Sequence, residues 1–373
     1  MLNLTDSEKR DIVRYIEEGK ELPEKYRFLL FENKRQVELL WNGKTDEVTN
    51  VVLPFQTIEC VDEPRSEEHK KIQSDLFDFS GRQIQGWTNK LIWGDNKYIL
   101  SSLKNGILRD EIERQGGIKL IYIDPPFDVG ADFSMKIEIG DGESYEKSPN
   151  ILEEIAYRDT WGMGKDSFLS MIYKRLLLMK DLLADDGSIY VHCDWRVNSA
   201  LKNILDDIFN ISNFRNSITW KRSTMSGAKV VGNQFGRNSD TIHYYTKTNK
   251  PIFNRQFLPY SKEYLKKFTG KDEDGRIFRT QPVGSRSKES LEKLRQEGRV
   301  IKSKTGYEQI KFYLDDMKGV ALDDNWIDIK DIRTIQGVEK LDYPTQKPEK
   351  LLERIIKASS NEGDLVCDFF VGS

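Results

Sequence analysis

An alternation of short apolar runs with amphipathic segments, beginning near residue 90, is the feature that most limits how this 373-residue chain can fold. Residues 119–124 and 188–193 have the length and composition of buried strands. Between them, residues 167–183 carry apolar side chains at helical spacing, and Asp186-Gly187 follows as a stop signal. Strands that alternate with helices predict a doubly wound α/β sheet, in which ligands bind at the carboxyl ends of the strands.

Further segments complete the expected organisation. We predict strands at 91–93, 216–220, 241–245 and 365–370, and helices at 5–18, 23–41, 96–104, 197–209, 287–298 and 348–359. The alternation is lost between residues 251 and 340, which are charged and carry scattered aromatic residues. We therefore divide the chain into an accessory helical segment, a first core part, an insertion and a second core part, at 1–80, 81–250, 251–340 and 341–373.

Composition argues against a membrane-spanning chain and against a disordered one. No run of about 18 apolar residues occurs, and 18 Phe, 15 Tyr and 7 Trp residues are available to build cores. The cysteines Cys60, Cys193 and Cys367 are too few and too scattered for a disulfide framework or a zinc site. This usage fits a reducing compartment, so we expect a cytoplasmic protein without a metal centre.

The net charge of −3 hides a strongly basic block. Residues 215–314 carry 22 Lys and Arg against 9 Asp and Glu, a net +13, while the rest of the chain is acidic. A solvated surface and a nucleic-acid-binding segment both explain such a block, and charge alone does not choose between them.

The tetrapeptide Asp124-Pro125-Pro126-Phe127 ends the predicted strand at 119–124 and therefore lies at the expected ligand-binding edge. Because two prolines remove two backbone donors, the turn presents carbonyl acceptors, a carboxylate and an aromatic ring. This set suits an exocyclic amino group on a flat base. Asp124 and the Pro125 carbonyl would each accept one N–H, and the carboxylate would oppose positive charge developing on nitrogen. The plain alternative is a strand-ending Asp before a Pro-Pro loop.

This motif resembles the catalytic motif of the β-class amino-methyltransferases of DNA, which use S-adenosylmethionine. Asp-Pro-Pro-Phe is typical of the N6-adenine members, whereas N4-cytosine members more often have Ser-Pro-Pro-Tyr. The family places its cofactor motifs later, and Tyr343-Pro-Thr-Gln-Lys-Pro348 and Asp368-Phe-Phe-Val-Gly-Ser373 resemble them. Phe369 stands where the family usually has Pro. The resemblance covers roughly residues 90–373.

The resemblance implies a Rossmann-like, S-adenosylmethionine-dependent methyltransferase sheet with circularly permuted motif order and a target-recognition domain inserted in it. Catalytic roles are implied for Asp124, Pro125, Pro126 and Phe127. Cofactor contacts are implied for Asp95, Asp124, Thr345, Gln346, Lys347, Asp368, Phe370 and Gly372. Asp95 is explained equally well as a helix N-cap. The chemistry requires no metal.

Double-stranded DNA is the partner that the resemblance implies, because the basic block lies where the family carries its target-recognition region. Four basic residues flank the sheet edge and would hold phosphates: Lys221, Arg222, Lys229 and Arg237. The target base would have to leave the duplex. We expect a structural role for His192 rather than general-base catalysis, since an exocyclic amine attacks methyl without prior deprotonation.

The start of the chain, residues 22–32 and 37–45, more weakly resembles Mod subunits of type III restriction-modification systems. A restriction subunit and a second copy of the chain are therefore candidate partners, while a plain pair of packing helices is the simpler explanation. The expected activity is site-specific methylation of adenine N6. The alternatives are an N4-cytosine or RNA substrate, or a truncated, inactive DNA-binding remnant. Because the printed sequence stops at Ser373, inside the cofactor turn, we expect these residues alone to be poorly active.

Overall fold

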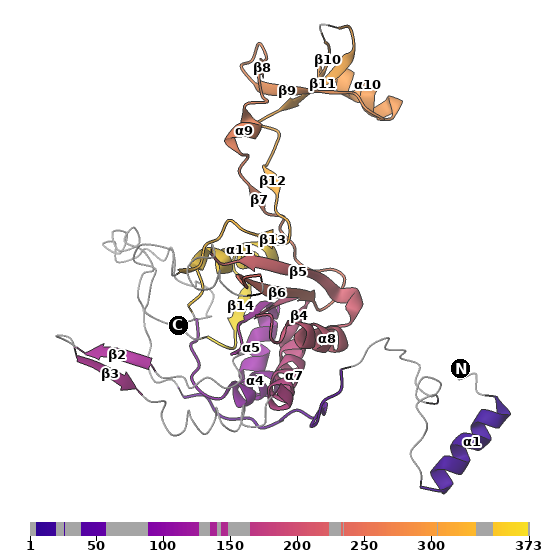
Figure 1. Cartoon of the computed structure of the whole chain (residues 1–373), viewed down its shortest axis with the longest axis vertical. Coiled ribbons are helices and arrows are strands. Elements are labelled where there is room, and N and C mark those ends of the chain that lie inside the picture. The colour runs from indigo at the N-terminus through magenta and orange to yellow at the C-terminus, as the bar shows by residue number, and fades with distance from the viewer. Residues whose placement is uncertain are drawn as a thin grey trace.

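A six-stranded sheet lies at the centre of the larger part of the molecule, seen in a computed structural model of the chain (Figure 1). The structure describes residues 5–19, 26, 39–56, 89–126, 135–139, 143–147, 165–223, 233, 235–303, 305–332 and 346–371. In spatial order the strands are β13 (Asn325–Trp326), β5 (Phe214–Lys221), β6 (Ser239–Thr246), β4 (Leu183–Cys193), β1 (Ile118–Ile123) and β14 (Leu365–Asp368). β6 alone is antiparallel to both of its neighbours. The expected α/β sheet is thus confirmed.

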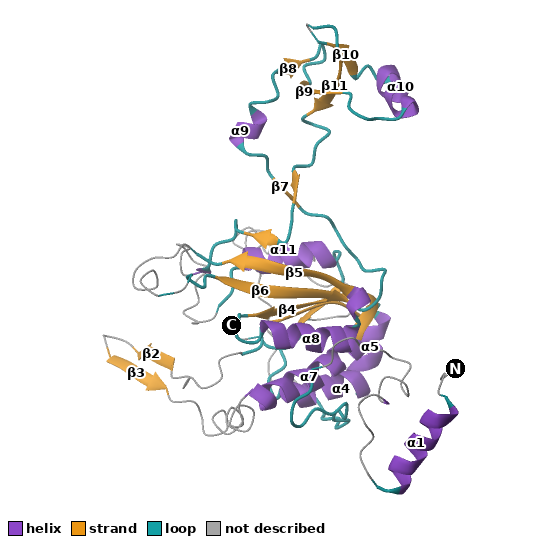
Figure 2. Ribbon diagram, turned by 45° about the vertical axis from the view of Figure 1, so that its right-hand side comes forward, coloured by secondary structure: helices purple, strands orange, loops and turns teal. Residues whose placement is uncertain are grey.

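Helices cover both faces of this sheet (Figure 2). One face packs against α4 (Asn96–Asn105), α5 (Leu108–Arg114), α7 (Lys165–Leu182) and α8 (Asn198–Phe209), and the other against α11 (Glu349–Ser359). Alternation along β1 shows why both faces are apolar. Ile121 and Ile123 pack into the core beneath α7, whereas Leu120 and Tyr122 pack towards α11. Such two-sided burial is expected for the central strands of an α/β sheet.

One expected strand is absent. Residues 89–93 form a loop, and the side chains of Leu91 and Trp93 are 87% and 92% exposed. The apolar triplet at 91–93 predicted a strand wrongly because no described strand lies beside it to accept its backbone hydrogen bonds. Conversely, the structure contains a helix, α5, in a segment for which the sequence predicted none. The expected helix at 23–41 lies almost wholly outside the described residues.

A smaller lobe joins the large sheet through a narrow stalk (Figure 1). The stalk pairs β7 (Phe257–Leu258) with β12 (Val320–Ala321). Beyond it, a four-stranded sheet contains β10 (Val300–Lys302), β11 (Glu308–Tyr313), β9 (Ile277–Pro282) and β8 (Gly270–Lys271), accompanied by α9 (Lys262–Leu265) and α10 (Lys288–Gln296). Lobe and stalk thus occupy 257–321 of the expected insertion, and β13, within the same expected range, returns to pair with β5.

Part of the amino-terminal segment lies along the helices of the large body. The indole N–H of Trp41 donates to the Ser170 hydroxyl at 2.8 Å, and Tyr173 donates to Asp46 at 2.6 Å. Lys44 pairs with Asp207 at 3.0 Å. Residues 39–53 therefore form a strap that ties α4, α7 and α8 together, where the sequence predicted only a helix end and a connector.

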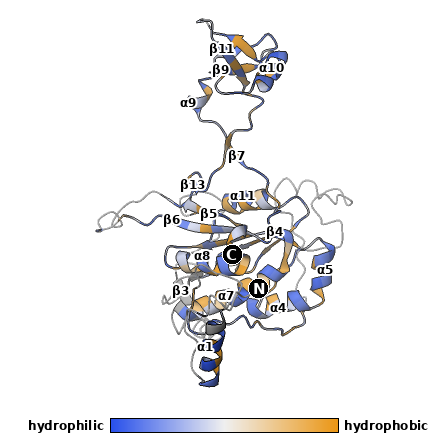
Figure 3. Ribbon diagram, turned by 90° about the vertical axis from the view of Figure 1, so that its right-hand side faces the viewer, coloured by the Kyte–Doolittle hydropathy of each residue, from blue (hydrophilic) through white to orange (hydrophobic). Residues whose placement is uncertain are grey.

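A short 3-10 helix, η1 (Ile211–Asn213), joins α8 to β5. Two further described parts lie at the periphery: α1 (Asp6–Glu17), and the hairpin of β2 (Met135–Ile139) and β3 (Glu143–Lys147). Thr5 and Glu8 cap the start of α1 reciprocally, and Figure 3 shows that this helix is mostly hydrophilic. Among the described residues, no helix has both the length and the apolar character that crossing a membrane requires.

Candidate functional site at the carboxyl edge of the sheet

Asp124 lies directly after β1, at the carboxyl edge of the large sheet, beside the end of β14. Its Oδ2 atom forms an ion pair with the Nζ of Lys347, and the two side chains are only 18% and 15% exposed. Its Oδ1 atom is buried and has no hydrogen-bond partner among the described residues. A buried carboxylate oxygen without a donor is costly, so this atom is ready to accept an N–H from a bound molecule.

The rest of the Asp-Pro-Pro-Phe motif is only partly described. Pro125 is buried and Pro126 is exposed, so the turn leaves the sheet at this point and reaches solvent. Phe127 lies outside the described residues. The motif therefore has the expected position after β1, while the place of its aromatic ring is not described.

Asp368 ends β14 and lies opposite Tyr122 of β1, which brings a second carboxylate to the same edge. Its Oδ1 accepts the backbone N–H of Phe370 at 2.8 Å. Burial, helped by the nearby Asp124 carboxylate, raises the pKa of Asp368 to about 6 despite the opposing bond from Phe370 and the charge of Lys347. An acid held at such a pKa favours a cationic partner, because a cation would stabilise its charged form.

The turn after β14 is fixed to α4. Asn96 donates from Nδ2 to the Phe369 carbonyl at 2.9 Å, and Phe369 and Phe370 pack against the main core. Phe369 stands at the position where the resemblance expects Pro, and its side chain packs against the core. Gly372, the next expected cofactor residue, lies outside the described residues.

Asp95 caps the amino-terminal end of α4. Its Oδ1 accepts the backbone N–H of Lys97 at 2.8 Å and a guanidinium N–H of Arg175 at 3.0 Å. Arg175 also contacts Asn96, and burial lowers its pKa. The capping interpretation of Asp95 is therefore observed, and Arg175 on α7 is a neighbour that sequence reasoning missed. No local signal marks Arg175, since about 80 residues separate it from Asp95.

Two residues expected at the cofactor's methionine end precede α11. Gln346 is half-buried, and Lys347 contacts Asp124 across 223 positions of sequence. Thr345 lies outside the described residues. The structure therefore brings Lys347, Asp124 and Asp368 together at one edge of the sheet.

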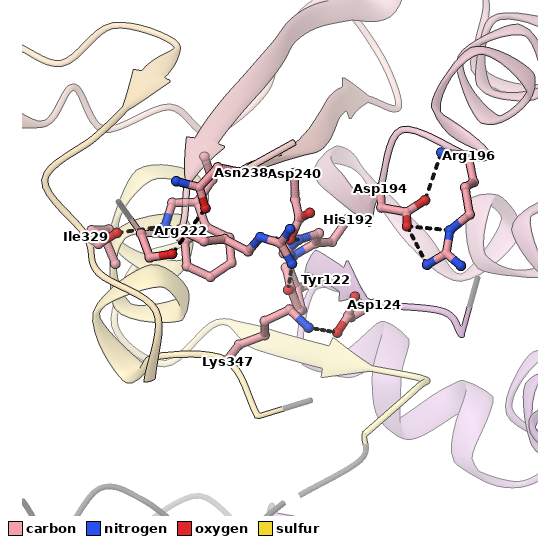
Figure 4. A network of polar contacts seen from close by, with 12 residues as sticks. Tyr122, Asp124, His192, Asp194, Arg196, Arg222, Asn238, Asp240, Ile329 and Lys347 are labelled. Atoms are coloured by element: carbon pink, nitrogen blue, oxygen red, sulfur yellow. Dashed lines mark hydrogen bonds and ion pairs between the residues drawn. The ribbon is translucent and has the colours of Figure 1, made fainter. Parts of the chain in front are cut away.

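A chain of buried polar groups lies behind Asp124 (Figure 4). The Tyr122 hydroxyl is 2.9 Å from Nδ1 of His192, and Nε2 of His192 is 3.2 Å from Oδ2 of Asp240. With Nε2 donating to Asp240, Nδ1 accepts from Tyr122. His192 is completely buried, and burial raises the pKa of Tyr122 well above its ordinary value, with Asp124 adding to the effect.

The four expected phosphate-binding residues have different surroundings. Lys221 is exposed at the end of β5, and Lys229 lies outside the described residues. Arg222 is half-buried, with its Nε 3.5 Å from Oδ2 of Asp240, so its charge faces the polar chain behind the site. The Arg237 guanidinium lies over the ring of Trp195, 3.8 Å from its centre. Sequence reasoning missed Trp195, although its place just after β4 could have indicated it.

A wide hollow of about 820 Å³ lies at the opposite edge, near the start of β1 and β4. Gly116, Lys119, Asp186 and Lys247 are among the residues that line it. None of the clustered carboxylates described above faces it. We therefore locate the candidate site by the strand ends and their side chains.

Comparison with known proteins agrees with this geometry. The sequence profile of the DNA methylase family (N6_N4_Mtase) matches residues 118–373, about two thirds of the chain. The chain is 32% identical over 309 residues to the type II methyltransferase M.EcaI of Enterobacter cloacae, covering 76% of this chain and 62% of that protein. It is 27% identical over 331 residues to the StyLTI Mod subunit of a type III restriction-modification enzyme from Salmonella typhimurium. That match covers 76% of this chain and 48% of the Mod subunit.

The chain therefore belongs to the N6/N4 DNA methylase family. It spans about half to three fifths of the length of these two relatives. The crystal structure of an M1.HpyAVI–SAM complex aligns over 74% of this chain and 78% of its own, at 13% identity and a TM-score of 0.34. Sequence similarity alone therefore places the chain in the family.

Proposed function

We propose that this protein transfers a methyl group from S-adenosylmethionine to the N6 amino group of adenine in DNA, as part of a restriction-modification system. The observation that carries the proposal is the Asp124 carboxylate, which lies at the carboxyl edge with one buried oxygen that has no hydrogen-bond partner in the part of the chain that the structure describes. An amino group that donates to this oxygen would satisfy it. Family membership and the Asp-Pro-Pro-Phe motif support the same chemistry.

Asp124 and Pro125 would orient the target nitrogen. Two N–H groups donated to the carboxylate and to the Pro125 carbonyl leave the nitrogen lone pair pointing away from both acceptors. The negative charge of Asp124 opposes the positive charge that develops on nitrogen during transfer, which is the electrostatic contribution expected of such a group. Pro126 keeps the turn rigid, and Phe127 would stack on the base. No general base is required at the nitrogen before the methyl group is transferred.

The carboxylates and the lysine at the edge fit the charges of S-adenosylmethionine, which would supply the electrophilic methyl group when bound. Asp368, with its raised pKa, suits the ammonium of the methionine part, and Lys347 suits its carboxylate. Phe370, Gly372, Thr345 and Gln346 would line the same part. Asp95 would face the adenine part beyond its capping role.

DNA would be held by charge and by the lobe. Lys221, Lys229 and Arg237 would contact phosphates, and Arg222 would contribute charge from behind the site. We assign target recognition to the lobe and stalk at 257–321 and catalysis to the sheet. We propose a restriction subunit as a partner, because the StyLTI relative is a Mod subunit of a type III restriction-modification enzyme. A second copy of the chain is our other candidate partner.

Identification of the methylated nucleoside tests this proposal. We would incubate the chain, in excess over DNA, with tritiated S-adenosylmethionine and mixed-sequence genomic DNA, digest the product and separate the nucleosides. We expect label in N6-methyl-2′-deoxyadenosine. Label in N4-methyl-2′-deoxycytidine would replace the adenine assignment, and the absence of label from DNA, with cofactor bound, would favour the inactive remnant.

A further inference from the structure

Trp195 is an exposed aromatic side chain at the same edge as Asp124. It lies two residues beyond β4, and 55% of its surface is exposed, which is high for the largest apolar side chain. The Arg237 guanidinium lies over one face of the ring. A tryptophan exposed beside the candidate site offers a bound molecule a flat face on which another ring can stack.

The backbone presents this ring in a fixed position. Asp194, which precedes it, is only 7% exposed and accepts both the backbone N–H of Arg196 at 2.9 Å and its side-chain Nε at 2.7 Å. The Asp194 carbonyl accepts the backbone N–H of Asn198 at the start of α8. The turn that carries Trp195 is therefore braced on both sides, so binding a ligand to the ring costs little ordering of the backbone.

The positively charged Arg237 guanidinium packs against one face of the Trp195 ring. It lies two residues before β6, and β6 pairs with β4 so that Thr241 is opposite Cys193. This register brings Arg237 and Trp195 to one edge, with the guanidinium 3.8 Å from the ring centre. Among the described residues Arg237 forms no ion pair, so its charge is not neutralised by a neighbouring carboxylate. A flat apolar ring beside such a cation matches a nucleobase and its phosphate.

We propose that Trp195, backed by Arg237, is a stacking platform for a nucleobase that has left the duplex at the rim of the methylation site. The proposal deepens the proposed function, on which it rests for the identity of the polymer. Aromatic stacking requires an unstacked base, and an enzyme that reacts with an exocyclic amino group must extrude one. The platform therefore assigns a positioning role to two residues that contact the DNA strand and not the transferred methyl group.

The experiment compares single-stranded oligonucleotides with and without bases, using the full chain. We would measure the affinity for a labelled oligonucleotide and for an abasic oligonucleotide of the same length, with no cofactor present. Stacking on one aromatic side chain corresponds to about 5- to 150-fold in affinity. We expect Trp195→Ala to lose affinity in this range for the normal oligonucleotide, Trp195→Phe to lose less, and neither to change binding of the abasic one.

Phe253→Ala is the matched control, since Phe253 is 54% exposed but lies near the opposite edge, next to Asn254, which is bonded to the end of α11. Arg237→Ala should weaken binding of both oligonucleotides. It should also make the logarithm of the binding constant fall less steeply with the logarithm of salt concentration, by the amount that corresponds to about one phosphate contact. Equal losses for the normal and abasic strands in Trp195→Ala, or no loss for either, would overturn the platform. The assay measures binding and needs no turnover. The stacking proposal can therefore fail here while the methyl-transfer test supports the proposed function, and the opposite combination is equally distinguishable.

Discussion

Lys347 forms an ion pair with Asp124, and this pair joins the loop before α11 to the turn after β1. The lysine ammonium donates to Oδ2 of the carboxylate. Oδ1, the oxygen to which the target amino group would donate, has no hydrogen-bond partner among the described residues. The protein therefore holds its own cation on one carboxylate oxygen and leaves the other oxygen for a substrate nitrogen.

A double-mutant cycle on this pair gives the first prediction. Removing one member leaves a half-buried charge without its partner, so Lys347→Met should lower the free energy of unfolding by about 1–3 kcal/mol. In an Asp124→Asn background the same substitution should cost clearly less, because the charge it would expose is gone. Urea unfolding of the four proteins measures the coupling. Additive effects would show that the two groups do not interact in solution.

The pH dependence of stability tests the burial of Asp368. Its pKa, about 6 in the folded chain, lies above the ordinary carboxyl value, so the folded state retains the proton longer than the unfolded state does. The stabilising contribution is fully present below about pH 4 and is lost as pH rises through about 6. Asp368→Asn should therefore be more stable than the parent at pH 7.5, by up to about 3 kcal/mol, and equal to it near pH 4. A constant difference across this range, measured by urea unfolding, would be incompatible with the raised pKa.

Tyr122 and His192 are expected to stabilise the fold as a unit. Tyr122→Phe removes a hydroxyl and leaves Nδ1 of a fully buried histidine without its donor, which should cost about 1–3 kcal/mol of unfolding free energy. Tyr98→Phe, on the partly exposed surface of α4, is the control and should change stability by less than about 0.5 kcal/mol. If the two substitutions have the same small effect, the polar chain behind Asp124 does not contribute to stability.

Removal of the lobe should separate DNA binding from cofactor binding. Leu258 and Val320 lie opposite each other in the stalk, so an Asn-Gly turn can join them in place of residues 259–319. The shortened chain should bind S-adenosylmethionine as the parent does, because the edge residues all remain. Its affinity for duplex DNA should fall more than about tenfold, with a smaller salt slope, as basic residues are lost. Calorimetry and fluorescence anisotropy measure the two affinities, and loss of cofactor binding in a folded protein would contradict this division.

Local patterns predicted most of the large sheet and the position of Asp124. The apolar run before the Asp-Pro-Pro motif is enough to place that carboxylate at a strand end, because strand burial and turn chemistry are properties of neighbouring residues. The same reasoning failed at 91–93, where a short apolar triplet has no described partner strand.

The contacts that complete the site could not be predicted in this way. Lys347 reaches Asp124, Arg175 reaches Asp95, and His192 reaches Asp240 across long stretches of sequence, so no periodicity marks them. Arg222 shows the same limit: its charge and position predicted a phosphate contact, while its observed neighbour is the Asp240 carboxylate. The resemblance indicated which residues belong to the site. Which of them contact each other became visible only in the folded structure.

The rate of methyl transfer by Asp124→Asn, in a single turnover with saturating tritiated S-adenosylmethionine, tests the central claim most directly. The substitution preserves shape but removes the charge that opposes positive charge on nitrogen, so the rate should fall about 100-fold or more while cofactor affinity changes little. Asp110→Ala, on the exposed face of α5, should keep the parent rate. A parent-like rate for Asp124→Asn would contradict the assignment of Asp124 as the residue that orients and stabilises the target amino group.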